Sequence, residues 1–294
     1  MSESDVEAVD PFDPDYPNFW IKLEHLGRYQ LAVDLLQKHI AGGKVSQDSK
    51  PERSVWPEPA PLALDVACGT GYGALELAAA GFRVAGVDRA AVISRLQSSL
   101  PEGNPAWLAV DLDCLAELGG RVGCDDYSRP TLHLVLASNE LSPVRAVCCF
   151  ETLEHVVDPA GLLRQLRACL EPGGQLLLSV PMAHQEPKHK DGSARNPYHR
   201  HLFTRSAVED MLQGAGFLIT EVFGQALCNR LLRRESRLLA GRRDGPAIRW
   251  HPTDPAAVRH LARLIGYPEA AGLDHSYSLL WRAEAEERKS FQRK

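Results

Sequence analysis

The sequence contains no pair of cysteines separated by two residues, and its seven cysteines are an odd number. Cys148 and Cys149 stand side by side within an apolar run. Zinc sites commonly use spaced cysteine pairs, and a complete set of disulfides needs an even number of cysteines. The pattern therefore predicts buried free thiols in a reducing compartment, and we expect a cytoplasmic protein.

Long apolar runs and an excess of basic charge are also absent. No stretch approaches the length of a transmembrane helix, and the acidic N-terminus lacks the positive charge and apolar core of a signal peptide. The formal net charge is −5 over 294 residues. Because nucleic-acid binding generally uses a basic surface, we expect no nucleic-acid partner.

The first 61 residues differ from the rest of the chain. Residues 1–18 carry six acidic residues, three prolines and no basic residue, which predicts an acidic flexible arm. Over 19–39 apolar residues recur at helical spacing, and 42–61 holds two glycines and four prolines, as in a linker. We expect the main domain to span 62–294.

Short apolar runs and helical patterns alternate over 62–294. Strands are expected at 62–67, 83–87, 106–110, 144–150, 175–180, 218–223 and 277–285, and helices at 74–80, 159–170 and 203–214. This alternation predicts an α/β fold with a doubly wound, mostly parallel seven-stranded sheet and helices on both faces. Two segments exceed this plan and are interpreted as inserts: 119–143, with the β-like run "TLHLVLA", and the arginine-rich 227–268.

A glycine-rich turn follows the first expected strand, in "LDVACGTGYG" (64–73). Gly69 and Gly71 would let the backbone approach a ligand, and the next helix would point free N–H groups at it. Asp88 ends the second expected strand, where a carboxylate accepts hydrogen bonds from ribose hydroxyls. These residues indicate an adenosine-containing cofactor, or else a tight turn that serves only helix–strand packing.

The spacing before the turn bears on which cofactor is bound. Dinucleotide sites usually read G-x-G-x-x-G, whereas this chain has Asp65-x-Ala67-x-Gly69-x-Gly71. An acid at the end of the first strand would repel a pyrophosphate and attract the ammonium of an amino-acid group. Alternatively, Asp65 caps the turn by accepting backbone N–H bonds.

The run "LDVACGTGYG" followed by "VAGVD" (84–88) resembles the first two motifs of class I S-adenosylmethionine-dependent methyltransferases, which normally have glycine where this chain has Ala67. "AVDLDCL" (109–115) is similar to the third-strand segment of that family. "CCFETLEHVVDP" (148–159) resembles the fourth-strand motif of a small-molecule branch that includes quinone-precursor O-methyltransferases. "LEPGGQLLLSVP" (170–181) and "NPYHRHLFT" (196–204) continue the likeness, and "EHLGRYQLA" (24–32) resembles a helix that closes over the cofactor.

The resemblance implies a Rossmann-like fold, S-adenosyl-L-methionine as the cofactor, and an N-terminal helical lid and linker over 19–61. Asp88 would hold the ribose, and Asp111 would meet the adenine amino group with Leu112 beside the ring. The full set of implied cofactor residues is Asp65, Ala67, Gly69, Gly71, Asp88, Arg89, Asp111, Leu112, Phe150 and Glu151.

Methyl transfer to a hydroxyl benefits from a base, and histidine is the usual one near neutral pH. His155 and His199 are the candidate catalytic residues, with His201 nearby. The structural alternatives are that His155 caps its helix and that the other two orient their loop. No metal site is assigned, although Glu151, Glu154 and His155 offer an alternative role as ligands of a divalent cation.

The expected reaction is O-methylation of a small molecule, lipid precursor or sugar. The alternatives are a nicotinamide-dependent oxidoreductase and a non-catalytic S-adenosylmethionine-binding module. The arginine-rich stretch 227–249 has a net charge of +5 from seven arginines and two acids. It would suit peripheral membrane contact, an anionic substrate or a lid, but a solvated helix face is the favoured reading.

Overall fold

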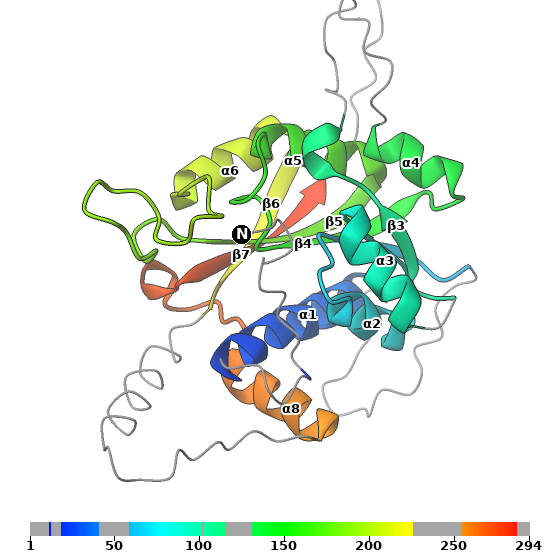
Figure 1. Ribbon diagram of the computed structural model, residues 1–294, viewed down its shortest axis with the longest axis horizontal. Coiled ribbons are helices and arrows are strands. Elements are labelled where there is room, and N and C mark those ends of the chain that lie inside the picture. Colours follow the sequence, from blue (N-terminus) through cyan, green and yellow to red (C-terminus); the bar gives the residue numbers. More distant parts are fainter. Residues whose placement is uncertain are drawn as a thin grey trace, which may run out of the picture.

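A computed structural model describes residues 12, 19–40, 59–100, 103–115, 131–225 and 254–286. These residues form one seven-stranded sheet in the order β3-β2-β1-β4-β5-β7-β6 (Figure 1). Its strands are β1 (Leu62–Val66), β2 (Arg83–Asp88), β3 (Ala106–Ala109), β4 (Val144–Phe150), β5 (Leu170–Pro181), β6 (Phe217–Gln225) and β7 (Ser278–Ala285). The first five strands are parallel, and β7 runs antiparallel to both β5 and β6.

Helices cover both faces of this sheet (Figure 1). On one face α4 (Leu132–Ser138), α5 (Pro159–Cys169) and α6 (Arg205–Gly214) pack into a core with the strands. On the other face lie α1 (Phe19–Ile40), α2 (Tyr72–Ala79) and α3 (Ala90–Ser99). The predicted doubly wound, mostly parallel α/β fold with seven strands is therefore confirmed.

The run 131–137 is a correction to the sequence prediction, because it forms helix α4 and not a strand. Thr131 begins the helix by accepting a hydrogen bond from the Leu134 amide, and Leu132 and Leu136 are buried against α5. Apolar residues four apart share one helix face, and here that spacing outweighs the β-branched content. The expected insert 119–143 thus contains a core helix, while 116–130 lies outside the described residues.

The end of the other expected insert packs against α1. It contains α8 (Pro255–Leu261) and the π-helical turn η3 (Ala262–Gly266). Gly27 of α1 and Gly266 touch through their backbones, since a Cβ added at Gly27 would lie 2.2 Å from the Gly266 oxygen. Arg263 and Tyr267 both bond Asp34 of α1. The C-terminal segment therefore holds α1 against the domain.

Three predicted segments fall outside the description. Most of the acidic arm 1–18, the linker 42–58 and the arginine-rich stretch 227–249 belong to the residues that are not described. Within the described ranges, no helix is both long and apolar enough to cross a membrane.

Candidate functional site

The glycine turn after β1 packs against two aromatic rings. Gly71 has φ +80°, and a Cβ there would lie 2.8 Å from the indole of Trp107 on β3. A Cβ on Gly73 would lie 2.0 Å from the phenol ring of Tyr29 on α1. Ala67 has φ +56°, a left-handed conformation that favours glycine. Glycine, the usual residue at this position in the family that the sequence resembles, adopts that conformation without strain.

Asp88 lies beside the turn at the end of β2. Its Oδ2 accepts a hydrogen bond from the Gly69 amide at 2.8 Å, and its Oδ1 accepts one from the Arg89 amide at 2.7 Å. Arg89 is the N-cap residue of α3. Each carboxylate oxygen keeps further acceptor capacity, so Asp88 joins the turn and remains able to accept from a ligand.

Asp111 lies one strand further out. It begins the short 3-10 helix Leu112–Cys114 by accepting from the Asp113 amide at 3.0 Å. Ala109 pairs with Asp88 across β3 and β2, so Asp111 lies just beyond that pair at the same edge. Asp111 is exposed, and Leu112 is half-buried against the core.

Asp65 is fully buried in β1 and bonds α1. Tyr29 Oη donates to Asp65 Oδ1 at 2.7 Å, while Oδ2 has no partner within the described chain. Burial raises the pKa of Asp65 to about 7. The ring of Tyr29 meets Tyr72 and Phe150 edge-on, with centroids 5.3 and 4.9 Å apart. The ends of β1 and β4 are thus joined by an aromatic cluster under α1.

Glu151 follows β4 with φ +49°. Ser179 of β5 and Ser278 of β7 donate to its two carboxylate oxygens at 2.9 and 3.3 Å. Arg28 Nη2 of α1 lies 3.6 Å from Glu151 Oε1. The carboxylate is therefore held from two strands and one helix.

Arg28 is a site residue that the sequence analysis missed. Its side chain is 3% exposed, Nε donates to Gln225, and Nη1 has no hydrogen-bond partner within the described residues. A buried, incompletely paired guanidinium is rare in proteins because desolvation of its charge is costly. The helical pattern gave no sign of it, since charged residues of an amphipathic helix ordinarily face solvent.

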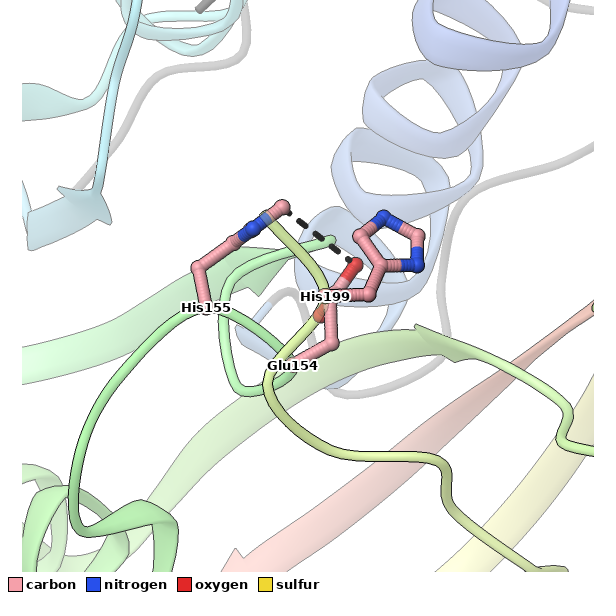
Figure 2. Close-up of side chains that lie close together, drawn as sticks. All are labelled: Glu154, His155 and His199. Atoms are coloured by element: carbon pink, nitrogen blue, oxygen red, sulfur yellow. Dashed lines mark ion pairs between the residues drawn. The ribbon is translucent and has the colours of Figure 1, made fainter. Parts of the chain in front are cut away.

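Glu154, His155 and His199 lie together beyond β4 and β5 (Figure 2). Glu154 is 1% exposed, and neither of its carboxylate oxygens has a hydrogen-bond partner in the described structure. His155 Nε2 lies 3.8 Å from Glu154 Oε1 (Figure 2). One ligand atom from each of the three residues lies within 4.8 Å of the other two.

The two histidines are oriented by different partners. His155 Nδ1 lies 2.9 Å from the carbonyl oxygen of Tyr198, so Nδ1 carries the proton and Nε2 keeps its lone pair. His199 Nδ1 lies 3.1 Å from Glu186 Oε1, and the two rings meet edge-on at 5.0 Å. The two atoms are at ion-pair distance, but Nδ1 has no aligned hydrogen-bond partner among the described residues. A carboxylate near Nδ1 favours a proton there and leaves the Nε2 lone pair available.

The ionisable groups around these histidines are shifted in several directions. Burial, reinforced by Glu151, raises the pKa of Glu154 well above its usual value. Burial lowers the pKa of His155. Burial tends to raise the pKa of Glu186, but the nearby His199 ring and the hydrogen bond from Tyr277 hold this pKa below the usual value. Glu186 is therefore the anionic partner in this group.

His201 makes the contacts expected of a residue that orients its loop. Its Nε2 bonds the Val156 carbonyl at 2.9 Å, and its ring stacks on Phe203. The amides of Arg200 and His201 donate to the Glu154 carbonyl, which joins the loop after β5 to the segment after β4.

The predicted residues therefore gather at the carboxyl ends of the parallel strands, where open α/β sheets bind their ligands. A family described as a methyltransferase domain matches residues 48–222, more than half of the chain. This chain belongs to that methyltransferase family. The predicted class, a methyltransferase, is thus confirmed over a nicotinamide-dependent oxidoreductase.

Curated relatives are similar over part of their length. The ubiquinone biosynthesis O-methyltransferase of Chromobacterium violaceum is 28% identical over 188 residues, covering 61% of this chain and 65% of the relative. The protein of the same name from Ralstonia nicotianae is 34% identical over 125 residues, covering 41% and 45%. The chain thus spans less than two thirds of either relative.

Two solved methyltransferase structures have a similar chain path at low sequence identity. An S-adenosylmethionine-dependent methyltransferase from Mesorhizobium loti has a TM-score of 0.47 and 18% identity, covering 79% of this chain and 94% of that one. Magnesium protoporphyrin IX methyltransferase from Synechocystis PCC 6803 has a TM-score of 0.45 and 18% identity, covering 91% and 84%.

Proposed function

We propose that this protein transfers a methyl group from S-adenosyl-L-methionine to a hydroxyl oxygen of a small molecule. The observation that carries the choice of oxygen is the contact between His199 Nδ1 and Glu186 Oε1, 3.1 Å apart. It places a carboxylate beside Nδ1 of a histidine at this edge of the sheet, as a base for a hydroxyl acceptor would use. The names of the curated relatives, O-methyltransferases of ubiquinone biosynthesis, support the same reaction class.

The nucleotide part of the cofactor is assigned to the ends of the first three strands. Gly69 and Gly71, with Ala67 before them, form the turn, and Asp88 accepts from the ribose hydroxyls. Asp111, Leu112 and Arg89, at the same edge of the sheet as Asp88, would contact the adenosine. This assignment is supported by the two backbone bonds that hold Asp88 against the turn.

The amino-acid part is assigned to the ends of β1 and β4. Asp65 would hold the ammonium through its unpartnered Oδ2, and Arg28 would hold the carboxylate through its unpartnered Nη1. Phe150 and Glu151 line the same place. Tyr29, the neighbour of Arg28 in the chain, donates a hydrogen bond to Asp65. One turn of α1 therefore reaches the places assigned to the ammonium and to the carboxylate of the cofactor.

The bound sulfonium supplies an activated methyl group. His199 Nε2 would accept the proton of the acceptor hydroxyl while that oxygen bonds the methyl carbon and the bond from this carbon to the sulfonium sulfur breaks, its electron pair staying on sulfur. Glu186 balances the positive charge that His199 gains, and its low pKa keeps it anionic. In the alternative role, His199 only orients the hydroxyl.

A divalent cation at Glu154, His155 and His199 is a second candidate, supported by the two unpartnered oxygens of Glu154. The donor set fits, because His155 Nδ1 is fixed by a carbonyl and Nε2 is available as a ligand. The cation would lower the pKa of a coordinated hydroxyl. Dialysis against EDTA and titration with Mg²⁺ or Zn²⁺ distinguish His199 as a metal ligand from His199 as a base, since only the metal site requires a cation for turnover.

The compartment and the domain limits are further proposals. A reducing cytoplasm is supported by the free thiols of Cys68, Cys148, Cys149 and Cys169, all buried. We retain 1–18 as an arm, 19–61 as lid and linker, and 62–294 as the main domain. Lipid precursors and sugars are further acceptor classes within this proposal, whereas peripheral membrane contact through 227–249 is not favoured.

The experiment measures cofactor choice first and acceptor choice second. S-adenosylmethionine or S-adenosylhomocysteine at a hundred times its Kd should stabilise the protein by about 2.7 kcal/mol, and NAD or NADP should not. Labelled methyl groups should then be transferred to phenols and catechols and be recovered as methyl ethers. Stabilisation by a nicotinamide cofactor alone, or methylation of amines but not phenols, would overturn the corresponding half of the proposal.

A further inference from the structure

Gln225, the last residue of β6, connects three parts of the protein through one buried amide. Its Oε1 accepts from Arg28 Nε at 2.5 Å, and its Nε2 donates to the carbonyl oxygens of Glu24 and Gly266. The side chain is 4% exposed. A guanidinium can only donate and a carbonyl can only accept, so the orientation of the amide is determined by its partners.

This arrangement depends on the close contact between α1 and η3. A Cβ on Gly266 would lie 2.0 Å from the Leu23 oxygen, so the two backbones meet without a side chain between them. The carbonyls of Glu24 and Gly266 therefore both come within reach of a single amide group. A side chain at Gly27 or at Gly266 would move the two backbones, and with them these two carbonyls, apart.

Gln225 in turn limits the direction of Arg28. The guanidinium is planar, with its donors in a fixed fork. Gln225 holds Nε, and Glu151 lies 3.6 Å from Nη2. With these two nitrogens directed at protein oxygens, the direction of the unpartnered Nη1 is determined.

We propose that Gln225 is a positioning residue that aims Arg28 Nη1 at the carboxylate of the cofactor. Through its bond to Gly266, the segment 254–267 takes part in cofactor recognition without touching the cofactor. This inference rests on the proposed function, which places the methionine carboxylate at Arg28. Its expected signature is selectivity for ligands that carry the amino-acid part.

Two ligands separate this role from general stability. S-adenosylhomocysteine carries the amino-acid part, and 5′-methylthioadenosine has the adenosine and sulfur without it. In calorimetric titrations, Gln225→Met should weaken binding of the first about tenfold, as expected for loss of alignment of one charge-assisted hydrogen bond. Binding of the second should stay within a factor of about two, well below that tenfold step. On an Arg28→Met background, Gln225→Met should cause no further loss of selectivity.

Gln30→Met is the matched control. Gln30 Nε2 donates to the Arg259 carbonyl, so this variant also removes a bond between α1 and the C-terminal segment but does not touch Arg28. Its selectivity should equal that of the wild type. If Gln225→Met does not fold, Gln225→Asn, whose shorter amide cannot reach all three partners, should show the same loss.

Equal weakening of both ligands by the Gln225 variants would overturn the inference, because it would reveal a structural role alone. The same selectivity loss in Gln30→Met would overturn it too. If wild-type protein binds neither ligand, the proposed function fails. If it binds both and only the Gln225 effect is missing, the proposed function stands and this inference fails.

Discussion

The two halves of the sheet satisfy their polar groups in different ways. At the ends of β2 and β3, Asp88 and Asp111 accept backbone N–H groups. Beyond β4, neither carboxylate oxygen of Glu154 has a partner within the described residues. A buried polar group without a partner costs about 1–3 kcal/mol, and more if charged. The chain thus pairs Asp88 and Asp111 with its own backbone and leaves the Glu154 carboxyl unpaired. In the proposed function the first two belong to the nucleotide half of the site and Glu154 to the reacting half.

Asp65 lies on β1, at the boundary between these two halves of the sheet. One of its carboxylate oxygens accepts a hydrogen bond from Tyr29, and the other has no partner among the described residues. Variants in the two halves should therefore fail differently: those in the nucleotide half by losing affinity, and those in the reacting half by losing turnover and changing stability.

His199→Ala should have the largest effect on catalysis. Turnover should fall by about 10²–10⁴ if the residue is the base, with cofactor affinity nearly unchanged. A base also imposes an acid limb on the pH–rate profile, whereas an orienting residue does not.

His201→Ala is the control for His199→Ala, since His201 lies in the same loop and bonds only Val156 among the described partners of its ring nitrogens. Its turnover should stay close to that of the wild type in folded protein. If His199→Ala abolished cofactor binding while single-turnover chemistry continued, the loop would be a cofactor lid, and His155 would become the candidate base.

Asp88→Ala tests the nucleotide half. The proposed bonds to two ribose hydroxyls are charge-assisted, each worth roughly 1.5–3 kcal/mol, so the Kd should rise by about a hundredfold or more. Asp88→Asn should lose less, because an amide still accepts one bond. A Kd for Asp88→Ala within about threefold of wild type, measured by calorimetry, would remove Asp88 from the site.

Glu154→Gln tests whether the buried, unpaired carboxyl of Glu154 lowers the free energy of unfolding. Burial raises the pKa of Glu154, so the folded protein retains a proton that the unfolded chain releases above the ordinary value of 4.5. Wild-type stability should then fall by up to roughly 1.4 kcal/mol per pH unit above that value, a loss that the variant lacks. Urea denaturation at pH 5, 6 and 7 measures it; parallel pH profiles for the two proteins would contradict the argument.

The smallest effect is expected at the boundary residue. With a pKa of about 7, Asp65 is protonated at low pH and must lose a proton before it can hold an ammonium. Affinity for S-adenosylhomocysteine should therefore rise as the pH approaches 7, by at most about tenfold per pH unit, and level off above it. Asp65→Asn should bind more weakly and remove this dependence. If the dependence persists in the variant, another group is responsible.

The sheet could be predicted because strand patterns are local. Each of the seven expected strands is present, since buried parallel strands read as short apolar runs between turn residues. Helix α3 was missed, although Val92, Ile93 and Leu96 form a buried face. The segment of helix α4 was predicted to be β-like because a run of seven mostly apolar residues fits both the helical and the strand periodicity.

The site was predictable only where a motif carries it. The turn and Asp88 follow from spacing along the chain, and the loop bearing His199 was placed by resemblance. Arg28 and Gln225 have no such signal, because their importance comes from contacts between segments 197 positions apart. A helical pattern shows which face is apolar, but not that one charged residue on it is enclosed by the C-terminal segment.

The position of β7 has a consequence for biosynthesis. Because β7 lies between β5 and β6, β6 has no neighbour in the described sheet until residues 278–285 have left the ribosome. Throughout that interval the nascent chain presents an unpaired edge at β5, a template for wrong pairing. A chain that stopped before residue 278 would forfeit β6 together with β7, and with them Gln225 and Ser278. The candidate site would therefore be completed only after residues 278–285 have been synthesised, when β7 enters the middle of its own sheet.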